Sequence, residues 1–231
     1  MGIDPAVFVS NLAIFLVVLL LAVSVHEAAH AWVSYKFGDD TAFMLGRVTL
    51  NPIKHTDPIG TLLIPCVAFL LGALGGAYAR VPLIGWGKPT PVNPSKWSNY
   101  KWGNFSVSIA GVVANILLVF AGLIIAKIIM LSGVASTEFF NGRTPSGNPF
   151  VMFTEKLMLL NLSLAVFNLL PIPPLDGGKI LSSFLPESFQ PVLDMIEQFG
   201  FIILLFLIWQ GVFGYIISPF FFLLLSIIDS I

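Results

Sequence analysis

The stretch "FVSNLAIFLVVLLLAVSVHEAAHAW", residues 8–32, decides the fold, because it is long and apolar enough to cross a bilayer. Its ionisable side chains are His26, Glu27 and His30, all close to its end. Each such group would cost a few kcal/mol if it faced lipid at membrane depth. We therefore expect all three to face a polar interior, and a bound metal ion is the simplest compensation.

The composition of the whole chain agrees with a membrane protein. Of its 231 residues, 57% are hydrophobic and 10% are charged, and the mean hydropathy is +0.93. Soluble domains average about 25% charged residues. The net charge of -1 offers no basic excess for binding nucleic acid, and the single cysteine, Cys66, cannot form an internal disulfide. We expect an all-α polytopic membrane protein with about 4–6 membrane segments, counted by the ~20-residue length of a span.

Apolar runs divide the chain into segments, and loops with more lysine and arginine are expected on the cytoplasmic side. By this count loops 36–58 and 79–103 are cytoplasmic, and loop 132–149 is external. Both flanks of segment 59–84 then lie on one side, so this segment is either a re-entrant hairpin, as the count suggests, or a plain span. We expect one integral-membrane domain over 1–231, with a catalytic core at about 7–185 and a C-terminal membrane segment at about 199–231.

The sequence His26-Glu27-Ala28-Ala29-His30 has the pattern H-E-x-x-H. On a helix, positions i and i+4 share a face, so both imidazoles can bind one zinc ion. A catalytic zinc site needs three protein ligands and an open position for water. Glu27 is placed beside the metal without binding it, where a carboxylate can act as general base and then general acid.

The third ligand is predicted from "NLLPIPPLDGG", residues 168–178, which ends a later apolar run. Its prolines break the helix, and its two glycines permit a tight turn. This broken helix would bring one carboxylate, Asp176, to membrane depth. The alternative is that Asp176 only caps the short helix that follows.

The two motifs together resemble those of the site-2 protease family of intramembrane zinc metalloproteases. The resemblance rests on His26, Glu27 and His30, followed by the pattern N-x-x-P-x-x-x-L-D-G from Asn168 to Gly177. It implies that His26, His30 and Asp176 bind one zinc ion and that Glu27 moves the proton. It gives Asn168 a role in holding the substrate strand or the developing oxyanion; a purely local helix-ending amide is the alternative.

By the same resemblance, the substrate is a membrane-spanning protein segment in a lipid bilayer. Larger relatives carry PDZ or CBS domains, and the loop at 132–149 is far too short for a PDZ domain, so the chain resembles a minimal branch. We expect the plasma membrane of a prokaryote, with the active site toward the cytoplasm. The oligomeric state is left open. A metal-ion transporter with the same ligands and a non-catalytic membrane scaffold are the alternative functions.

Three further features allow two interpretations each. His55 either reaches the site or pairs with Asp57 at the membrane interface. Asn115 either bonds between helices or contacts the catalytic strip. The segment "GWGKPTPVNP", residues 85–94, could align a substrate strand by main-chain pairing, although its Trp86 could equally be an interface anchor.

Overall fold

The structure, a computed structural model, describes residues 5–74, 86–140 and 148–230 of the chain. These residues form helices and no strands, so the prediction of an all-α protein is confirmed. A π-helical turn covers Pro58–Leu63, and 3₁₀ turns cover Pro94–Lys96 and Glu187–Phe189. The α-helices are α1 (Pro5–Lys36), α2 (Thr41–Met44), α3 (Pro52–His55), α4 (Ile64–Leu74), α5 (Tyr100–Leu131), α6 (Thr137–Phe140), α7 (Pro149–Asn168), α8 (Asp176–Ser182), α9 (Gln190–Trp209) and α10 (Val212–Ser230).

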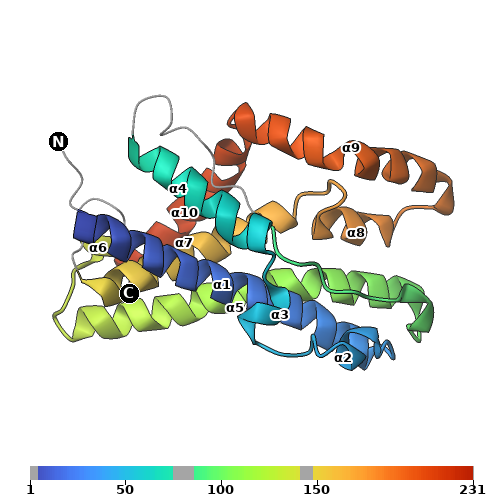
Figure 1. Cartoon of the computed structure of the whole chain (residues 1–231), viewed down its shortest axis with the longest axis horizontal. Helices are drawn as coiled ribbons and strands as arrows, with labels where there is room; N and C mark the ends of the chain where they lie inside the picture. Colours follow the sequence, from blue (N-terminus) through green and yellow to red (C-terminus); the bar gives the residue numbers. More distant parts are fainter. Residues whose placement is uncertain (1–4, 75–85, 141–147, 231) are drawn as a thin grey trace.

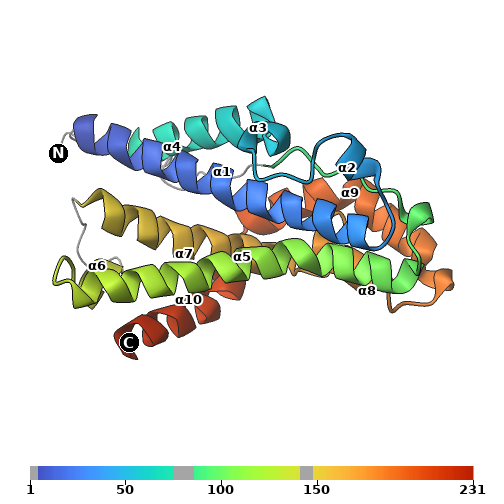
Figure 2. The same cartoon turned by 90° about the horizontal axis from the view of Figure 1, so that it is seen from below.

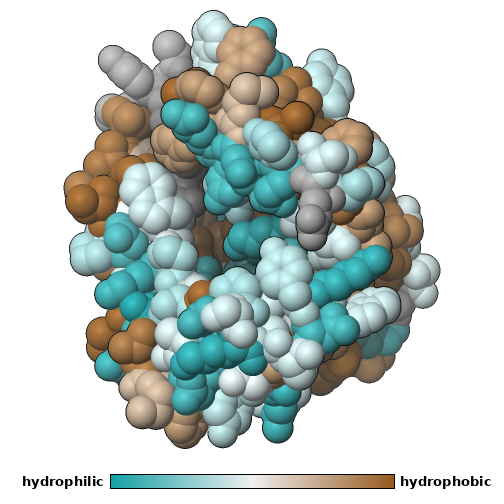
Figure 3. Space-filling view, turned by 90° about the vertical axis from the view of Figure 1, so that its right-hand side faces the viewer, coloured by the Kyte–Doolittle hydropathy of each residue, from teal (hydrophilic) through white to brown (hydrophobic). Residues whose placement is uncertain are grey.

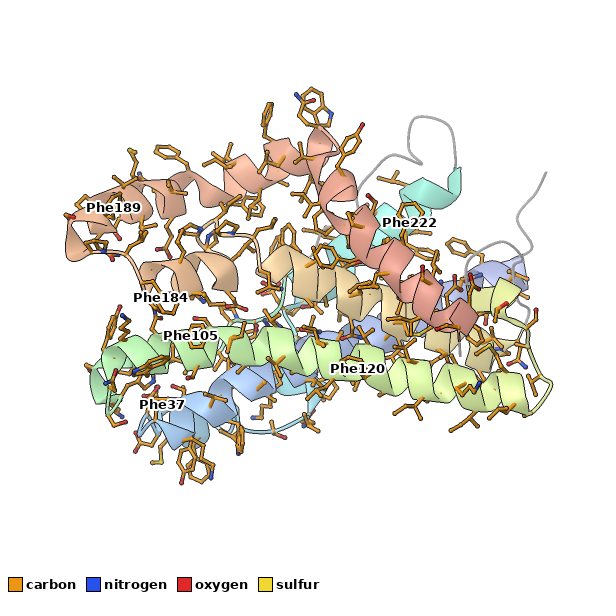
Figure 4. The ribbon with its side chains drawn as sticks, turned by 180° about the vertical axis from the view of Figure 1, so that it is seen from behind. Phe37, Phe105, Phe120, Phe184, Phe189 and Phe222 are labelled. Atoms are coloured by element: carbon orange, nitrogen blue, oxygen red, sulfur yellow. The ribbon has the colours of Figure 1, made fainter. Side chains whose placement is uncertain are left out.

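Five helices in the described part of the chain are long and apolar enough to cross a membrane, namely α1, α5, α7, α9 and α10. Their outer faces carry large apolar side chains such as Phe120 and Phe222, which are 56% and 68% exposed. These two phenylalanines lie on the outside of α5 and α10 (Figure 4). An apolar exterior of this kind is what a lipid environment requires, so the protein is an integral membrane protein.

Helices α1, α5 and α7 pack against one another and form the inner part of the bundle (Figures 1 and 2). Helix α10 packs on α7, and α9 contacts α8 and α10. The buried face of α5 includes Gly103, Gly111, Ala114 and Gly122, which lets the neighbouring helices come close.

The end of α7 is followed by the predicted break, because residues 169–175 are not helical and α8 begins at Asp176. Gly177 and Gly178 do not form the tight turn that we expected; both lie within α8. A Cβ at Gly178 would lie 2.8 Å from the backbone of Ile172, and one at Gly177 would collide with the carbonyl of Leu170. The two glycines therefore allow α8 to pack directly on the non-helical strip.

The last apolar run, at about 199–231, was predicted to form one membrane segment, and the structure differs from this prediction. The run forms two helices, α9 and α10, and α9 already begins at Gln190. The break lies at Gly211, whose φ of 74° is in the left-handed region that favours glycine. A glycine within an apolar run does not reveal from sequence whether it continues or ends a helix.

The start of segment 59–84 lies beside Trp86, which follows the segment in the chain. The Trp86 N–H donates to the Gly60 carbonyl at 3.2 Å, and the Thr61 hydroxyl donates to the Trp86 carbonyl at 2.7 Å. This contact agrees with an element that enters and returns on one side. Residues 75–85 lie outside the described residues, so the path between these two points stays a prediction.

One end of the bundle is polar. Viewed from that end, the surface is largely hydrophilic and is hollowed at its middle (Figure 3). Helix α1 ends here, α5 begins here, and α8 lies between α5 and α9 (Figure 1). Both termini lie toward the opposite end (Figure 1).

Candidate metal centre

The two histidines of α1 and Asp176 of α8 converge on one point. The Nε2 atoms of His26 and His30 are 3.0 Å apart, and the Asp176 Oδ2 lies 3.2 Å from each of them. All three residues are buried. Among the described residues, these two histidines and one aspartate are clustered closely enough to hold a metal ion. The structure therefore brings together the three predicted ligands, although Asp176 lies 146 residues after His30 in the sequence.

Hydrogen bonds at the Nδ1 atom of each imidazole determine whether its Nε2 atom carries a hydrogen or a lone pair. The Nδ1 of His30 lies 2.6 Å from the Val107 carbonyl, and the Nδ1 of His26 lies 2.6 Å from the Asn115 Oδ1. Both partners are oxygens that accept, so both Nδ1 atoms donate in the neutral rings. Each Nε2 therefore carries a lone pair, as a metal ligand must.

With both rings neutral, the centre contains three lone-pair atoms and no hydrogen between them. The Asp176 Oδ2 is buried and has no hydrogen-bond donor among the described residues. Three such acceptors about 3 Å apart would repel one another without a cation. Tetrahedral zinc with bonds of about 2.0–2.1 Å holds its ligand atoms roughly 3.3 Å apart. The donor set and its spacing therefore fit zinc.

Asp176 is presented by the start of α8, and it does not cap that helix. Leu175 occupies the N-cap position, and no side chain caps the helix there. The second carboxylate oxygen, Oδ1, lies 3.6 Å from the Lys179 Nζ, one helical turn on. Asn104 of α5 holds α8 in place by donating to the Lys179 carbonyl at 3.0 Å. Sequence reasoning missed Lys179, although its i+3 spacing from Asp176 was a visible signal.

Gly111 of α5 makes room for both imidazoles. A Cβ at this position would lie 2.5 Å from the His26 Cε1, 2.6 Å from the His30 Nε2 and 2.7 Å from the His26 Nδ1. Real Cβ contacts do not come this close, so α5 can pack over the rings only with glycine here.

Glu27 is held by the backbone of the segment after residue 85. The Thr90 N–H donates to the Glu27 Oε2 at 2.8 Å, and the Thr90 hydroxyl donates to the Glu27 carbonyl at 3.0 Å. Nothing in the sequence marked Thr90, because a main-chain donor leaves no residue-specific signature. The first bond fixes the carboxylate and the second ties the backbone of this half-buried residue, which directly follows His26.

From Trp86 onward, the segment 85–94 forms hydrogen bonds within the protein along one of its two main-chain edges. The N–H groups of Trp86, Lys88 and Thr90 bond to Gly60, His55 and Glu27, respectively. On the alternate positions, Pro89 and Pro91 have no N–H to offer. A substrate strand on the outer edge would therefore have to donate more hydrogen bonds than it accepts, and main-chain pairing there stays a prediction.

Asp39, at the end of α1, fastens the same segment and was missed by sequence reasoning. Its buried carboxylate accepts from the Asn93 N–H at 2.7 Å, the Ser34 hydroxyl at 2.9 Å and the Thr41 N–H at 3.0 Å. Burial raises the pKa of Asp39, but the hydrogen bonds outweigh it and hold the pKa below its ordinary value. Gly38, with φ of 104°, makes the turn that directs this carboxylate inward.

Two other predicted residues have local partners. The Asn168 amide donates to the Leu164 carbonyl at 2.9 Å, so its role toward substrate stays a prediction. His55 is fully buried and its Nε2 bonds to the Thr49 carbonyl at 2.8 Å. The pairing with Asp57, one of the two alternatives for His55, is not found: the His55 Nδ1 has no hydrogen-bond partner among the described residues, and the Asp57 carboxylate caps the turn that begins at Pro58.

Comparison with known proteins identifies the family. Residues 14–208 match Peptidase family M50. The chain is 36% identical over 203 residues to "Putative zinc metalloprotease YwhC" of Bacillus subtilis (strain 168), covering 88% of this chain and 83% of that protein. Two proteins called Rip2, also described as zinc metalloproteases of this kind, are 31% identical (Mycolicibacterium smegmatis, 86% of this chain and 69% of the relative) and 32% identical (Mycobacterium tuberculosis H37Rv, 87% and 67%).

No solved structure matches the chain. The family match extends from the middle of α1 to the end of α9, and it therefore includes all three residues of the metal centre and Glu27. The chain belongs to peptidase family M50, the site-2 protease family.

Proposed function

We propose that this zinc metalloprotease binds one zinc ion through His26, His30 and Asp176 and hydrolyses peptide bonds in or near the transmembrane segments of other proteins. The family and the names of its relatives support the protease activity. The single observation that carries the ligand assignment is the convergence of two buried histidine nitrogens and one carboxylate oxygen at 3.0–3.2 Å. We further propose that residues 1–231 act as one integral-membrane domain.

When bound, zinc supplies Lewis acidity that polarises the scissile carbonyl and acidifies water. The Glu27 carboxylate takes a proton from the attacking water and transfers it to the leaving nitrogen as the C–N bond breaks. The Thr90 N–H holds the Oε2 of Glu27 and leaves Oε1 for this proton. Asn168, at the end of α7, is our candidate for a hydrogen bond to the substrate backbone.

The substrate segment must unwind before it can be cut, because a helix engages its own amides in hydrogen bonds. The polar, hollowed end of the bundle supplies the water that hydrolysis consumes (Figure 3). Its loops are those with more lysine and arginine, which supports a cytoplasmic position for this end in the plasma membrane of a prokaryote. Regulated intramembrane proteolysis, the release of a protein from its membrane anchor, is the biological role that we propose.

The test is cleavage of a membrane-spanning reporter by the full chain in liposomes, with the cleaved bond located by mass spectrometry. We expect a cut within or beside the reporter's span, and loss of cleavage in Asp176→Asn. Asp194→Asn is the matched control, because Asp194 is exposed on α9 and bonds to Gln190. Equal cleavage by Asp176→Asn would contradict the proposal. Zinc uptake into the liposomes without cleavage would instead support a transporter.

A further inference from the structure

His26 can bind zinc only in one tautomer, and a side chain decides which one it adopts. Its partner at Nδ1 is the amide of Asn115, which has an accepting oxygen on one side and a donating nitrogen on the other. With the oxygen toward the ring, Nδ1 is protonated and Nε2 keeps its lone pair. With the nitrogen toward the ring, Nε2 would carry the hydrogen and could not bind a cation.

A chain of hydrogen bonds ending at a main-chain carbonyl settles this orientation. The Leu157 carbonyl can only accept, and the Asn161 Nδ2 donates to it at 2.8 Å. The Asn161 Oδ1 is thereby turned toward Asn115 and accepts from its Nδ2 at 2.7 Å. The Asn115 Oδ1 is then turned toward His26 Nδ1, at 2.6 Å. Each amide is fixed by the one before it.

The two asparagines are fully buried, so water does not offer them other partners at the protein surface. The Asn115 Nδ2 has one further acceptor, the Ala22 carbonyl, at 3.5 Å, which is too long for a strong bond. Without Asn161, the orientation of the Asn115 amide would be only weakly determined. His30 needs no such chain, because its partner is the Val107 carbonyl itself.

We propose that Asn161 of α7 is a positioning residue of the metal centre, acting through Asn115 of α5 to hold His26 of α1 in its zinc-binding tautomer. The inference rests on the proposed assignment of His26, His30 and Asp176 as zinc ligands. The relay couples the packing of the three inner helices to metal affinity. A bond that served only helix packing would affect stability and leave zinc affinity unchanged.

The experiment measures zinc affinity of the purified full chain by competition with a chromophoric chelator, with the Co²⁺-substituted visible spectrum as a second readout. Loss of an outer partner of a ligand histidine typically weakens metal binding by about 10–100-fold. We expect about 10-fold for Asn161→Leu, at the low end of this range, and at least as much for Asn115→Leu. Their Co²⁺ spectra should change as well. Thr154→Val is the matched control, because Thr154 is buried on the same helix and bonds to the Phe150 carbonyl.

The double variant separates a relay from two independent effects. If Asn161 acts through Asn115, adding Asn161→Leu to Asn115→Leu should not weaken zinc binding further. Asn161→Ser, which is too short to reach Asn115, replaces Asn161→Leu if that variant does not fold, and it should show the same loss. Wild-type affinity in the Asn161 variants, or multiplied losses in the double variant, would overturn the relay. Undiminished zinc binding by His26→Ala would instead overturn the ligand assignment.

Discussion

Replacing Gly111 by alanine tests whether the metal centre depends on the close approach of α5. The added Cβ would lie 2.5–2.7 Å from three imidazole atoms of His26 and His30. Neither ring can swing away freely, since each is bonded at Nδ1 at 2.6 Å. Relief must come from tilting the rings or from moving α5 away from α1, and both displace the Nε2 atoms from their common point.

Overpacking a buried position typically costs about 1–3 kcal/mol. The clash here involves two rigid rings, so we take the upper part of this range. If about 2–3 kcal/mol of strain arises only when both rings converge on the metal, the dissociation constant for zinc rises about 30- to 150-fold, at ~1.4 kcal/mol per factor of ten. The variant should still fold, because the metal-free protein can tilt the rings at the expense of their Nδ1 hydrogen bonds.

The assay is chelator competition for zinc, with reporter cleavage measured at saturating zinc in parallel. Gly122→Ala is the matched control: it lies on the same buried face of α5, and its Cβ would meet only the flexible side chain of Met158. We expect Gly122→Ala to change stability and leave zinc affinity as in the wild type. Wild-type zinc affinity in Gly111→Ala would show that zinc binding does not depend on the close approach of α5.

Three further predictions concern the surroundings of the site. Asp39→Ala should lower the free energy of unfolding by about 2–3 kcal/mol, because charge-assisted hydrogen bonds are lost. Since the folded-state pKa of Asp39 is depressed, this stabilisation is present above about pH 4 and fades as the pH falls through the folded-state pKa. Denaturation of both proteins at several pH values measures it. Thr90→Pro removes the N–H that holds Glu27, so cleavage should fall about 10-fold or more while bound zinc is unchanged. The control variant Thr90→Val keeps this N–H and should keep most of the activity. Loss of zinc in the proline variant would contradict a role of Thr90 in positioning Glu27. Lys179→Met should weaken zinc binding by up to about fivefold through its ion pair with Asp176, since exposed pairs contribute roughly 0.2–1 kcal/mol, and chelator competition at low and high salt measures it.

The sequence predicted the parts of the site that rest on helical periodicity and on electrostatic cost. His26 and His30 are one turn apart on a helix, so their convergence follows from residue spacing alone. Asp176 could be predicted because a carboxylate beside three prolines in a membrane protein needs a partner. The family motif joined the two segments, which no local pattern could have done.

The parts that escaped prediction depend on main-chain geometry or on contacts between distant segments. Thr90 holds Glu27 through a backbone N–H, 63 residues away, and any residue except proline has that donor. Asn115 was expected either to bond between helices or to contact the catalytic strip, but Asn161 was not marked, and only their packing shows that the two form one chain to His26. The division of the C-terminal run depends on the left-handed conformation of Gly211, which composition does not specify.

The most direct test of the central claim compares bound zinc and peptide cleavage in the wild type and in Glu27→Gln. Glutamine keeps the shape of Glu27 and can still accept the Thr90 hydrogen bond, but it cannot take a proton from water. We predict about one zinc ion per chain in both proteins, as a three-ligand catalytic site requires, and cleavage of a membrane-spanning reporter only by the wild type. Cleavage by Glu27→Gln at the wild-type rate, or zinc lost along with cleavage, would contradict it.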